Sequence, residues 1–236
     1  MLRLDIITLF PELFTAWMAI GINRRAFDLG LAQAVFWNPR DFTSDTYRRV
    51  DDRPYGGGPG MVMLAAPLAA AIQAAMARQA LHGNPSPTVL YLSAQGQPTQ
   101  HTHIEKLRAD SGLIVLCGRY EGVDQRLIDK YVTQQLCVGD FVVSGGELPA
   151  MMVLDAMLRL IPGVLNDPQS VQADSFYHGI LDHQHYTRPE LFEGTPVPPV
   201  LMSGNHADIA AWRRREALHL TQTHRPDLLE NSKKPL

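Results

Sequence analysis

The chain has 236 residues, of which 45% are hydrophobic and 19% charged, and its formal net charge at pH 7 is −3. This composition is typical of a globular protein with a sizeable core, and it excludes intrinsic disorder over most of the chain. The charge also excludes a protein that is basic overall, so a nucleic-acid partner would have to meet a local basic patch. At about 150 residues per domain, the length predicts one or two domains.

The N-terminal stretch is apolar, but Asp5, Pro11 and Glu12 interrupt it. It matches neither a secretory signal peptide nor a membrane span, and we expect a soluble, cytoplasmic protein. The two cysteines, Cys117 and Cys137, lie in apolar runs. They are expected to be small buried hydrophobic residues, and a disulfide between them stays open at this point.

Over the first 160 residues, short apolar runs alternate with helical patterns. Strands that alternate with helices indicate parallel βαβ units, and continuous apolar strands indicate a sheet covered on both faces. The predicted fold class is therefore α/β. The predicted strands cover residues 2–9, 31–37, 88–93, 113–117 and 136–143, and the predicted helices cover residues 11–20, 67–79, 99–108, 123–130 and 148–160.

The composition changes after Arg159. Residues 161–175 contain two prolines and one glycine and show no periodicity, which is typical of a linker. A further helix is predicted over residues 207–221, with Asn205 as its N-cap. We therefore expect an α/β domain over residues 1–160, a linker over 161–175 and a small, mainly helical domain over 176–236.

Four polar or glycine-rich loops are candidates for a ligand site. Three of them, residues 91–98, 117–124 and 138–149, follow predicted strands, where ligands of parallel sheets bind. The fourth, residues 51–61, has three adjacent glycines whose backbone N–H groups could face an anion. Each loop also has a plain interpretation as a turn. Ser144 and Glu147 in particular have the spacing of a capping box for the helix that follows.

Several common sites are missing from the sequence. No Gly-x-Gly-x-x-Gly opens a βαβ unit, and there is no P-loop lysine, Gly-x-Ser-x-Gly elbow or cysteine cluster. The pairs His101/His103 and His183/His185 are expected on strand faces. Two histidines are an incomplete set of zinc ligands, so no metal site is predicted.

Three consecutive arginines, Arg213, Arg214 and Arg215, lie in the predicted C-terminal helix. They fan out over about 200° of the helix, so one or two of them can meet phosphate. A solvated helix face explains them equally well. Arg159 and Asp174 flank the predicted linker. An i,i+4 helix pair with Asp155 would explain Arg159 without any function, and an ordinary loop position would explain Asp174.

Taken together and in this order, the loops resemble those of the bacterial tRNA (guanine-N1)-methyltransferases. The resemblance covers nearly the whole chain and departs at Ala94, where the family has proline, and at Phe141, where it has tyrosine. The strings that carry it are DIITLFP from Asp5, DDRPYGGGPGM from Asp51, YLSAQG from Tyr91, LCGRYEGVDQR from Leu116, VGDFVVSGGELPAM from Val138, DSF from Asp174, HYTRPE from His185 and PPVLMSGNHADI from Pro198.

The resemblance implies the SPOUT methyltransferase fold, in which a parallel sheet carries a deep trefoil knot near the cofactor site. It also implies an obligate homodimer whose two subunits share each active site. The implied cofactor is S-adenosyl-L-methionine, held largely through backbone contacts. The matching cofactor-binding positions are Tyr91, Leu92, Ser93, Gly118, Tyr120, Glu121, Val138, Gly139, Phe141, Val143, Gly145, Gly146 and Pro149.

The implied reaction transfers a methyl group to N1 of guanine-37, the base 3′ of the tRNA anticodon. Since N1 carries a proton at neutral pH, a general base is needed, and the family match assigns this role to Asp174. Arg159 is assigned to charge that develops on guanine O6, and Glu121 is linked to a Mg²⁺ requirement. The residues assigned to the guanine and RNA site are Asp182, His185 and Arg188, to which the Arg213–Arg215 cluster is added.

Two alternatives stay open at this point. One is a ribose 2′-O-methyltransferase of the same superfamily, which also needs an activated nucleophile. The other is an RNA-binding protein that keeps the scaffold without the chemistry, although the presence of both Asp174 and Arg159 disfavours it.

Overall fold

The computed structural model describes residues 1–167 and 169–231. It divides into two compact units, Met1–Asn166 and Asp167–Leu236, each of which is described by itself. Within the described ranges, none of the helices has both the length and the apolar character needed to cross a membrane.

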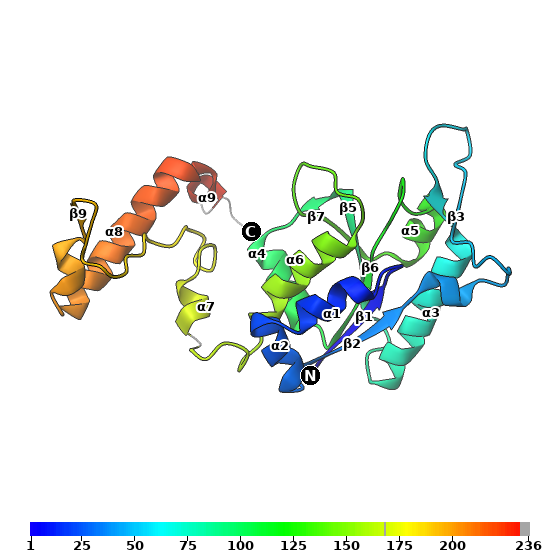
Figure 1. The fold of residues 1–236 in the computed structure, drawn as a ribbon, viewed down its shortest axis with the longest axis horizontal. Coiled ribbons are helices and arrows are strands. Elements are labelled where there is room, and N and C mark those ends of the chain that lie inside the picture. Colours follow the sequence, from blue (N-terminus) through cyan, green and yellow to red (C-terminus); the bar gives the residue numbers. More distant parts are fainter. Residues whose placement is uncertain (168, 232–236) are drawn as a thin grey trace. The chain divides into compact units, whose positions relative to one another are not determined.

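The first unit is built on a parallel sheet of five strands in the order β2-β1-β6-β5-β7 (Figure 1). The α/β prediction is therefore confirmed. The strands are β1 (Leu2–Ile7), β2 (Ala32–Trp37), β5 (Thr88–Pro98), β6 (Gly112–Leu116) and β7 (Gln134–Cys137). The helices are α1 (Glu12–Met18), α2 (Gly21–Asp28), α3 (Ala65–Leu81), α4 (His101–Ala109), α5 (Gln125–Tyr131) and α6 (Glu147–Leu158), with a 3₁₀ turn at Pro39–Phe42.

Alternate residues of the central strands face opposite layers of helices. In β6, Leu113 and Val115 pack into a cluster with α1, α2, α4 and α6, whereas Ile114 and Leu116 pack into a cluster with α3 and α5. Both sets are fully buried. This is the arrangement expected for uninterrupted apolar strands of a parallel sheet. The carboxyl ends of the strands are thereby left as the edge at which a ligand can reach the sheet.

The predicted strand over residues 136–143 is wrong beyond Cys137. β7 is the last strand of the sheet and pairs with β5 alone, and its pairing ends at Cys137 opposite Pro98. The apolar run that follows has no strand to pair with, and it leaves the sheet as a loop in which Val142 is 91% exposed.

Two further elements differ from the prediction. β5 continues to Pro98, with a register shift between Leu92 and Gln97 that bulges the intervening residues out of the sheet. Helix α2 was not predicted, because its sequence is mostly polar. It is held instead by a side-chain hydrogen bond that its buried Asn23 donates to Asp155 of α6 over 2.8 Å.

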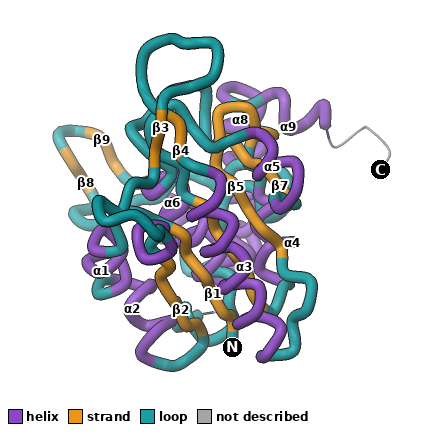
Figure 2. The backbone as a smooth tube through the Cα atoms, turned by 90° about the vertical axis from the view of Figure 1, so that its right-hand side faces the viewer, coloured by secondary structure: helices purple, strands orange, loops and turns teal. Residues whose placement is uncertain are grey.

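A short antiparallel pair, β3 (Asp51–Asp52) and β4 (Val62–Met63), carries the glycine-rich loop between its strands. This loop, residues 53–61, projects from the unit (Figure 2). Gly56, Gly57, Gly58 and Gly60 all have positive φ, a conformation that favours glycine.

Both cysteines are buried and free, so the interpretation as small core residues is confirmed and the disulfide is excluded. Cys117 is fully buried, and this burial, with Glu147 nearby, raises the pKa of its thiol well above the ordinary value.

We predict that Cys117 is inert in the native protein at pH 7–9, because a raised thiol pKa keeps the reactive thiolate from forming. Iodoacetamide labelling read by peptide mass spectrometry checks this, with labelling in denaturant as the positive control. Native-state labelling of Cys117 as fast as that of the unfolded chain would contradict it.

The second unit is mainly helical. Its longest helix, α8 (His206–His224), begins at the predicted cap: the side chain of Asn205 accepts hydrogen bonds from the backbone N–H groups of Ala207 and Asp208. The other elements are α7 (Gln169–Ala173), the hairpin β8 (Leu191–Phe192) and β9 (Thr195–Pro196), a 3₁₀ turn at Pro199–Met202 and α9 (Pro226–Asn231). Helix α7 lies within the segment expected as a linker, and the linker role of residues 161–175 stays a prediction.

Candidate functional site

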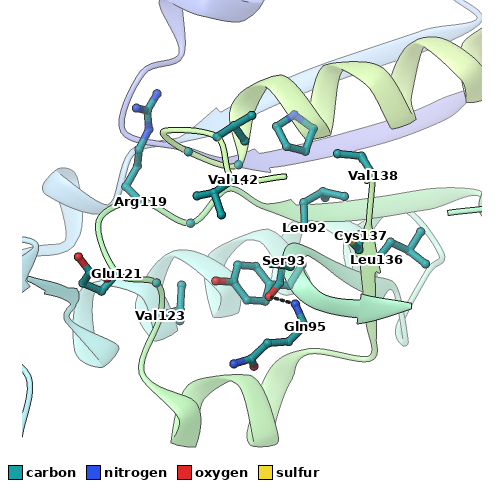
Figure 3. A pocket seen from close by; sticks show the side chains of 18 of the residues that line it. Leu92, Ser93, Gln95, Arg119, Glu121, Val123, Leu136, Cys137, Val138 and Val142 are labelled. Atoms are coloured by element: carbon teal, nitrogen blue, oxygen red, sulfur yellow. Dashed lines mark hydrogen bonds between the residues drawn. The ribbon is translucent and has the colours of Figure 1, made fainter. Parts of the chain in front are cut away.

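The irregular middle part of β5, residues 91–95, and the loops that follow β6 and β7 surround a cavity of about 300 Å³ (Figure 3). Figure 3 shows Leu92, Leu136 and Val138 on one side of this cavity and Glu121 on the other. All thirteen residues that the sequence assigns to the cofactor line it. Its volume is in the range of small-molecule sites, and its wall combines apolar side chains with a few polar groups. The lining residues that the sequence analysis did not assign to the cofactor include Ala94, Gln95, Arg119, Gly122, Val123, Gln125, Ile128, Leu136, Cys137, Val142 and Ser144.

The glycines of these loops stand where chain segments come too close for a side chain. A Cβ added at Gly146 would lie 2.8 Å from the Cα of Cys117, and one at Gly118 would lie 2.9 Å from the ring of Tyr91. Likewise, a Cβ at Gly96 would lie 2.5 Å from the carbonyl carbon of Leu136. Real Cβ atoms do not occupy such positions, so the cavity wall is backbone because the packing requires it.

The loops after β6 and after β7 are joined directly. The backbone N–H of Gly146 donates to the carbonyl of Gly118 over 2.8 Å, and Arg119 and Gly145 form an isolated β-bridge. The guanidinium of Arg119 also donates to the carbonyl of Ser144 over 3.2 Å and stacks on the ring of Phe10 at 4.4 Å. Arg119 therefore connects both loops to the end of β1.

The capping box predicted for Ser144 and Glu147 is wrong. The N-cap of α6 is Gly146, which makes no side-chain cap. Glu147 is instead 1% exposed; one of its oxygens accepts a hydrogen bond from the hydroxyl of Thr8 over 2.9 Å, and the other lies 2.8 Å from Nε of Arg119. Spacing alone does not distinguish a glutamate that turns back to cap a helix from one that points under the sheet edge.

The glycine-rich loop reaches the cavity through Glu121. A Cβ at Gly60 would fall 2.2 Å from the carboxylate of Glu121, so the side chain of Glu121 lies directly against this glycine. The backbone N–H of Glu121 donates to the carbonyl of Met61 over 2.9 Å. Residues 53–61 thus set the position of the carboxylate that the resemblance links to magnesium.

Two tyrosines of the cavity wall have raised pKa values. Burial raises the pKa of Tyr91, while a hydrogen bond with the backbone of Val123 opposes the shift. Burial, followed by the negative charge of Asp51, raises the pKa of Tyr120. Both hydroxyls therefore stay protonated around neutral pH and are hydrogen-bond donors rather than bases.

The two residues assigned to catalysis lie in different units. Arg159 is the half-buried C-cap of α6 in the first unit, where its backbone N–H donates to the carbonyl of Asp155 over 3.2 Å. Asp174 is a half-buried residue directly after α7 in the second unit. Their roles in the reaction stay predictions.

The residues assigned to the RNA site are all in the second unit. Asp182 is held by a hydrogen bond from its backbone N–H to the hydroxyl of Ser175, and one of its carboxylate oxygens lies 2.9 Å from Nε2 of His185. Arg188 is exposed, as are Arg213, Arg214 and Arg215 on α8.

The expected strand positions of the histidine pairs are wrong. His101 and His103 open helix α4, because their segment follows the end of β5 and turns into the next helix. His183 and His185 lie in an irregular segment, where Asp182 adds a carboxylate to the two imidazoles.

Comparison with known proteins agrees with this geometry. The model of the family described as tRNA (Guanine-1)-methyltransferase TrmD matches residues 2–231. A tRNA (guanine-N(1)-)-methyltransferase of Janthinobacterium sp. (strain Marseille) is 55% identical over 228 residues, which are 97% of this chain and 92% of the relative. Proteins of the same name from Burkholderia mallei (strain SAVP1) and Burkholderia pseudomallei (strain 668) are each 55% identical over 233 residues, 99% of this chain and 88% of theirs. The chain therefore belongs to the tRNA (guanine-1)-methyltransferase TrmD family.

Proposed function

We propose that this protein transfers a methyl group from S-adenosyl-L-methionine to N1 of guanine-37 in tRNA. The observation that carries the proposal is the convergence of all thirteen assigned cofactor positions on one cavity in a chain of this family. A tRNA substrate would place the protein in the cytoplasm.

The cavity suits the proposed cofactor. Part of its wall is bare backbone at Gly118 and Gly146. These positions have no room for a side chain, because Gly118 packs against Tyr91 and Gly146 packs against Cys117. Apolar side chains such as Leu92 and Val138 suit the adenine ring, and Glu121 supplies a negative charge for a ligand that carries an ammonium and a sulfonium. When bound, S-adenosyl-L-methionine supplies an electrophilic methyl group.

The protein's own contribution is to make guanine N1 a nucleophile. In the proposed step the carboxylate of Asp174 accepts the N1 proton, and the electron pair left on N1 would form the bond to the methyl carbon as the methyl–sulfur bond breaks, with S-adenosyl-L-homocysteine as the leaving group. As N1 loses its proton, negative charge builds on guanine O6 until the methyl group is transferred, and the guanidinium of Arg159 is proposed to stabilise this charge. The base must leave its stack to be reached, and Asp182, His185 and Arg188 are the residues proposed to receive it.

A homodimer is part of the proposal. In the cavity wall, Phe141 is 57% exposed and Val142 91% exposed, and on α6 Leu148 and Met152 are each 55% exposed. Large apolar side chains grouped in this way support an interface with a second copy of the chain. Magnesium is proposed to act near Glu121, since Mg²⁺ is commonly held through one or two carboxylates and water.

The test is transfer of a radiolabelled methyl group to tRNA transcripts, followed by nucleoside identification. We expect 1-methylguanosine with guanine at position 37 and no product with adenosine there. Methylation of the adenosine transcript on its ribose would establish the 2′-O alternative. Tight tRNA binding without transfer under any condition would establish the non-catalytic one.

We predict that Arg159→Ala lowers the rate of methyl transfer by about 10²–10³-fold, the range for loss of a charge-stabilising donor. Single-turnover kinetics measure this rate. Arg126, an exposed arginine that pairs with Asp124, supplies the matched control: Arg126→Ala should keep the wild-type rate. A wild-type rate in Arg159→Ala would assign Arg159 to helix packing alone.

We predict that changing Arg213, Arg214 and Arg215 to glutamine weakens tRNA binding and lowers the slope of log K against log salt by about 0.7–0.9 for each phosphate that the variant no longer neutralises. Filter binding at several salt concentrations measures the slope. Gln substitutions at three exposed residues of the first unit, Arg24, Arg108 and Arg126, are the control for reduced net charge. An unchanged slope in the triple variant would exclude this patch from tRNA binding.

A further inference from the structure

Asp182, His183 and His185 form a cluster in the second unit that the methyl transfer does not explain. Each offers one metal-ligand atom, and these three atoms lie within 4.8 Å of one another. We propose that this cluster binds a divalent transition-metal ion of the zinc class. The proposed function uses Asp182 and His185, but it gives no role to His183.

The hydrogen bonds of His183 prepare it as a ligand. Its Nδ1 lies 2.8 Å from the carbonyl oxygen of Gln184. A carbonyl can only accept, so Nδ1 is the donor, and when the ring is neutral the lone pair is on Nε2. This pattern, one ring nitrogen bonded to a carbonyl and the other free to coordinate, is the usual state of metal-binding histidines.

The lone pair of His183 faces a carboxylate. Nε2 of His183 lies 3.8 Å from Oδ1 of Asp182, and Nε2 of His185 lies 2.9 Å from Oδ2 of the same side chain. A lone pair that faces a carboxylate oxygen needs a positive charge between them, from a proton or a metal ion. At 2.9 Å Nε2 of His185 donates a hydrogen bond to this carboxylate, and a bound metal ion would replace that proton and join both imidazoles and the carboxylate at one centre.

The distances suit a small ion. Tetrahedral zinc binds nitrogen and oxygen at about 2.0–2.1 Å, which puts adjacent ligand atoms about 3.3 Å apart. Nε2 of His185 and Nε2 of His183 lie 2.9 and 3.8 Å from the two different carboxylate oxygens of Asp182, and the three ligand atoms lie within 4.8 Å of one another, so they have to move closer together around a bound ion. The side chain of His185 is 71% exposed, so it can rotate to close these distances.

The rest of the cluster is held in place from α8. The ring of His183 packs edge-on against Trp212, with 6.2 Å between centroids, and its side chain is only 14% exposed. The backbone N–H of Leu181 donates to the hydroxyl of the buried Thr221 over 3.0 Å. Two ligands are thus fixed by packing and hydrogen bonds, and the third lies on the solvent side, where an ion can enter.

The donor set selects the class of metal. Two imidazoles and one carboxylate suit zinc, cobalt or nickel, whereas magnesium prefers oxygen ligands alone. Three protein ligands leave a fourth position to water, as in zinc sites that exchange a ligand. A site with this ligand set is expected to bind zinc reversibly.

Binding would interfere with the RNA substrate. This consequence rests on the proposed function, in which Asp182 and His185 contact the target guanine. A metal ion that occupies their ligand atoms removes those contacts, so zinc is expected to act as an inhibitor that competes with tRNA.

The first test measures binding of the metal alone to the chelator-treated, full-length protein. We expect one equivalent of Co²⁺ to give the visible absorption of a tetrahedral site, and one equivalent of Zn²⁺ to displace it. His183→Gln and the exposed-site variant His185→Gln should each lower the affinity at least about tenfold. His206→Gln, which changes an exposed histidine of the same unit, is the matched control and should bind as the wild type does.

Absence of the tetrahedral Co²⁺ spectrum from the wild-type protein would overturn the proposal. So would equal affinity in His185→Gln, whose exposed side chain can change without disturbing the fold, or an equal loss in His206→Gln. Far-ultraviolet circular dichroism of each variant confirms that the chain is folded.

The second test adds zinc to the methyl-transfer assay. Zinc should inhibit the wild-type enzyme, and excess tRNA should relieve the inhibition. His183→Gln should need at least about tenfold more zinc for the same inhibition. In the presence of chelator, both proteins should have the same rate. Zinc that binds without inhibiting would overturn the competition with tRNA and leave the site established. Failure of methyl transfer in chelator would count against the proposed function, and the Co²⁺ result would still decide the metal site.

Discussion

Replacing Asp174 with alanine is expected to abolish measurable methyl transfer while leaving S-adenosyl-L-methionine binding nearly unchanged. Guanine N1 holds its proton at neutral pH, and a positioned general base contributes about 10²–10⁴-fold to the rate. Asp174 belongs to the second unit, whereas the assigned cofactor positions all lie in the first. A substitution at Asp174 should therefore change the chemical step and spare cofactor affinity.

Two measurements separate a base from a structural residue. Calorimetric titration gives the cofactor Kd, and single-turnover methyl transfer with saturating tRNA gives the chemical rate. Asp227→Asn is the matched control, because Asp227 is an exposed carboxylate of the same unit whose side chain pairs with Arg225. Residual transfer above about one tenth of the wild-type rate in Asp174→Ala would reject Asp174 as the base, and a large loss of cofactor affinity would assign it to the cofactor site.

The sheet of the first unit could be predicted from the sequence because its strands are buried on both faces. In β6, Leu113, Ile114, Val115 and Leu116 form an unbroken apolar run, and all four are fully buried. Such a run has few interpretations when helical patterns precede and follow it. The position of the loops over residues 117–124 and 138–149 at one cavity was also predictable, because they follow β6 and β7 of a parallel sheet.

The end of β7 could not be predicted in the same way. Residues 138–143 are as apolar as a strand, but a strand needs a neighbour, and β7 has only β5 beside it. Pairing with β5 stops at Cys137, so the next residues leave the sheet and line the cavity. Local sequence carries the apolar pattern but not the identity of the pairing partner.

The catalytic assignment depends on the resemblance and not on pattern. Arg159 has an ordinary position at the end of α6, and Asp174 follows a helix of five residues. Their spacing in the sequence does not predict a shared site, since Arg159 belongs to the first compact unit and Asp174 to the second. The cluster of Asp182, His183 and His185 could not be predicted from the sequence either. The sequence shows the two histidines, but only the structure adds the orientation of Asp182 and the hydrogen bond that fixes the ring of His183.

Replacing Glu147 with alanine is expected to cost about 3 kcal/mol of folding free energy, the low end of the range for removing one partner of a buried ion pair. Glu147 is 1% exposed, and it is the partner of both the buried hydroxyl of Thr8 and the guanidinium of Arg119. Its loss leaves the hydroxyl of Thr8 without its acceptor and the guanidinium of Arg119 without its opposite charge, in a region that water reaches poorly. For a chain of this size the loss corresponds to a fall in Tm of roughly 6–12 °C.

The same substitution should weaken cofactor binding. Arg119 holds the carbonyl of Ser144 and forms the bridge to Gly145, so a guanidinium released from Glu147 loosens the loop that lines the cavity. Glu147→Gln keeps an acceptor for Thr8 but loses the charge opposite Arg119, and it should lie between the wild type and the alanine variant in both stability and affinity.

Urea unfolding and calorimetric titration of S-adenosyl-L-methionine check the two effects separately. Glu105→Ala is the matched control: Glu105 is 49% exposed and lies 3.9 Å from His101, so its removal should change the unfolding free energy by less than about 0.5 kcal/mol. If Glu147→Ala were as stable as Glu105→Ala, the buried pair would contribute nothing to folding. If it lost stability but bound the cofactor normally, Glu147 would support the core alone, and the loop at Ser144–Gly146 would be held in place by its backbone contacts with Gly118.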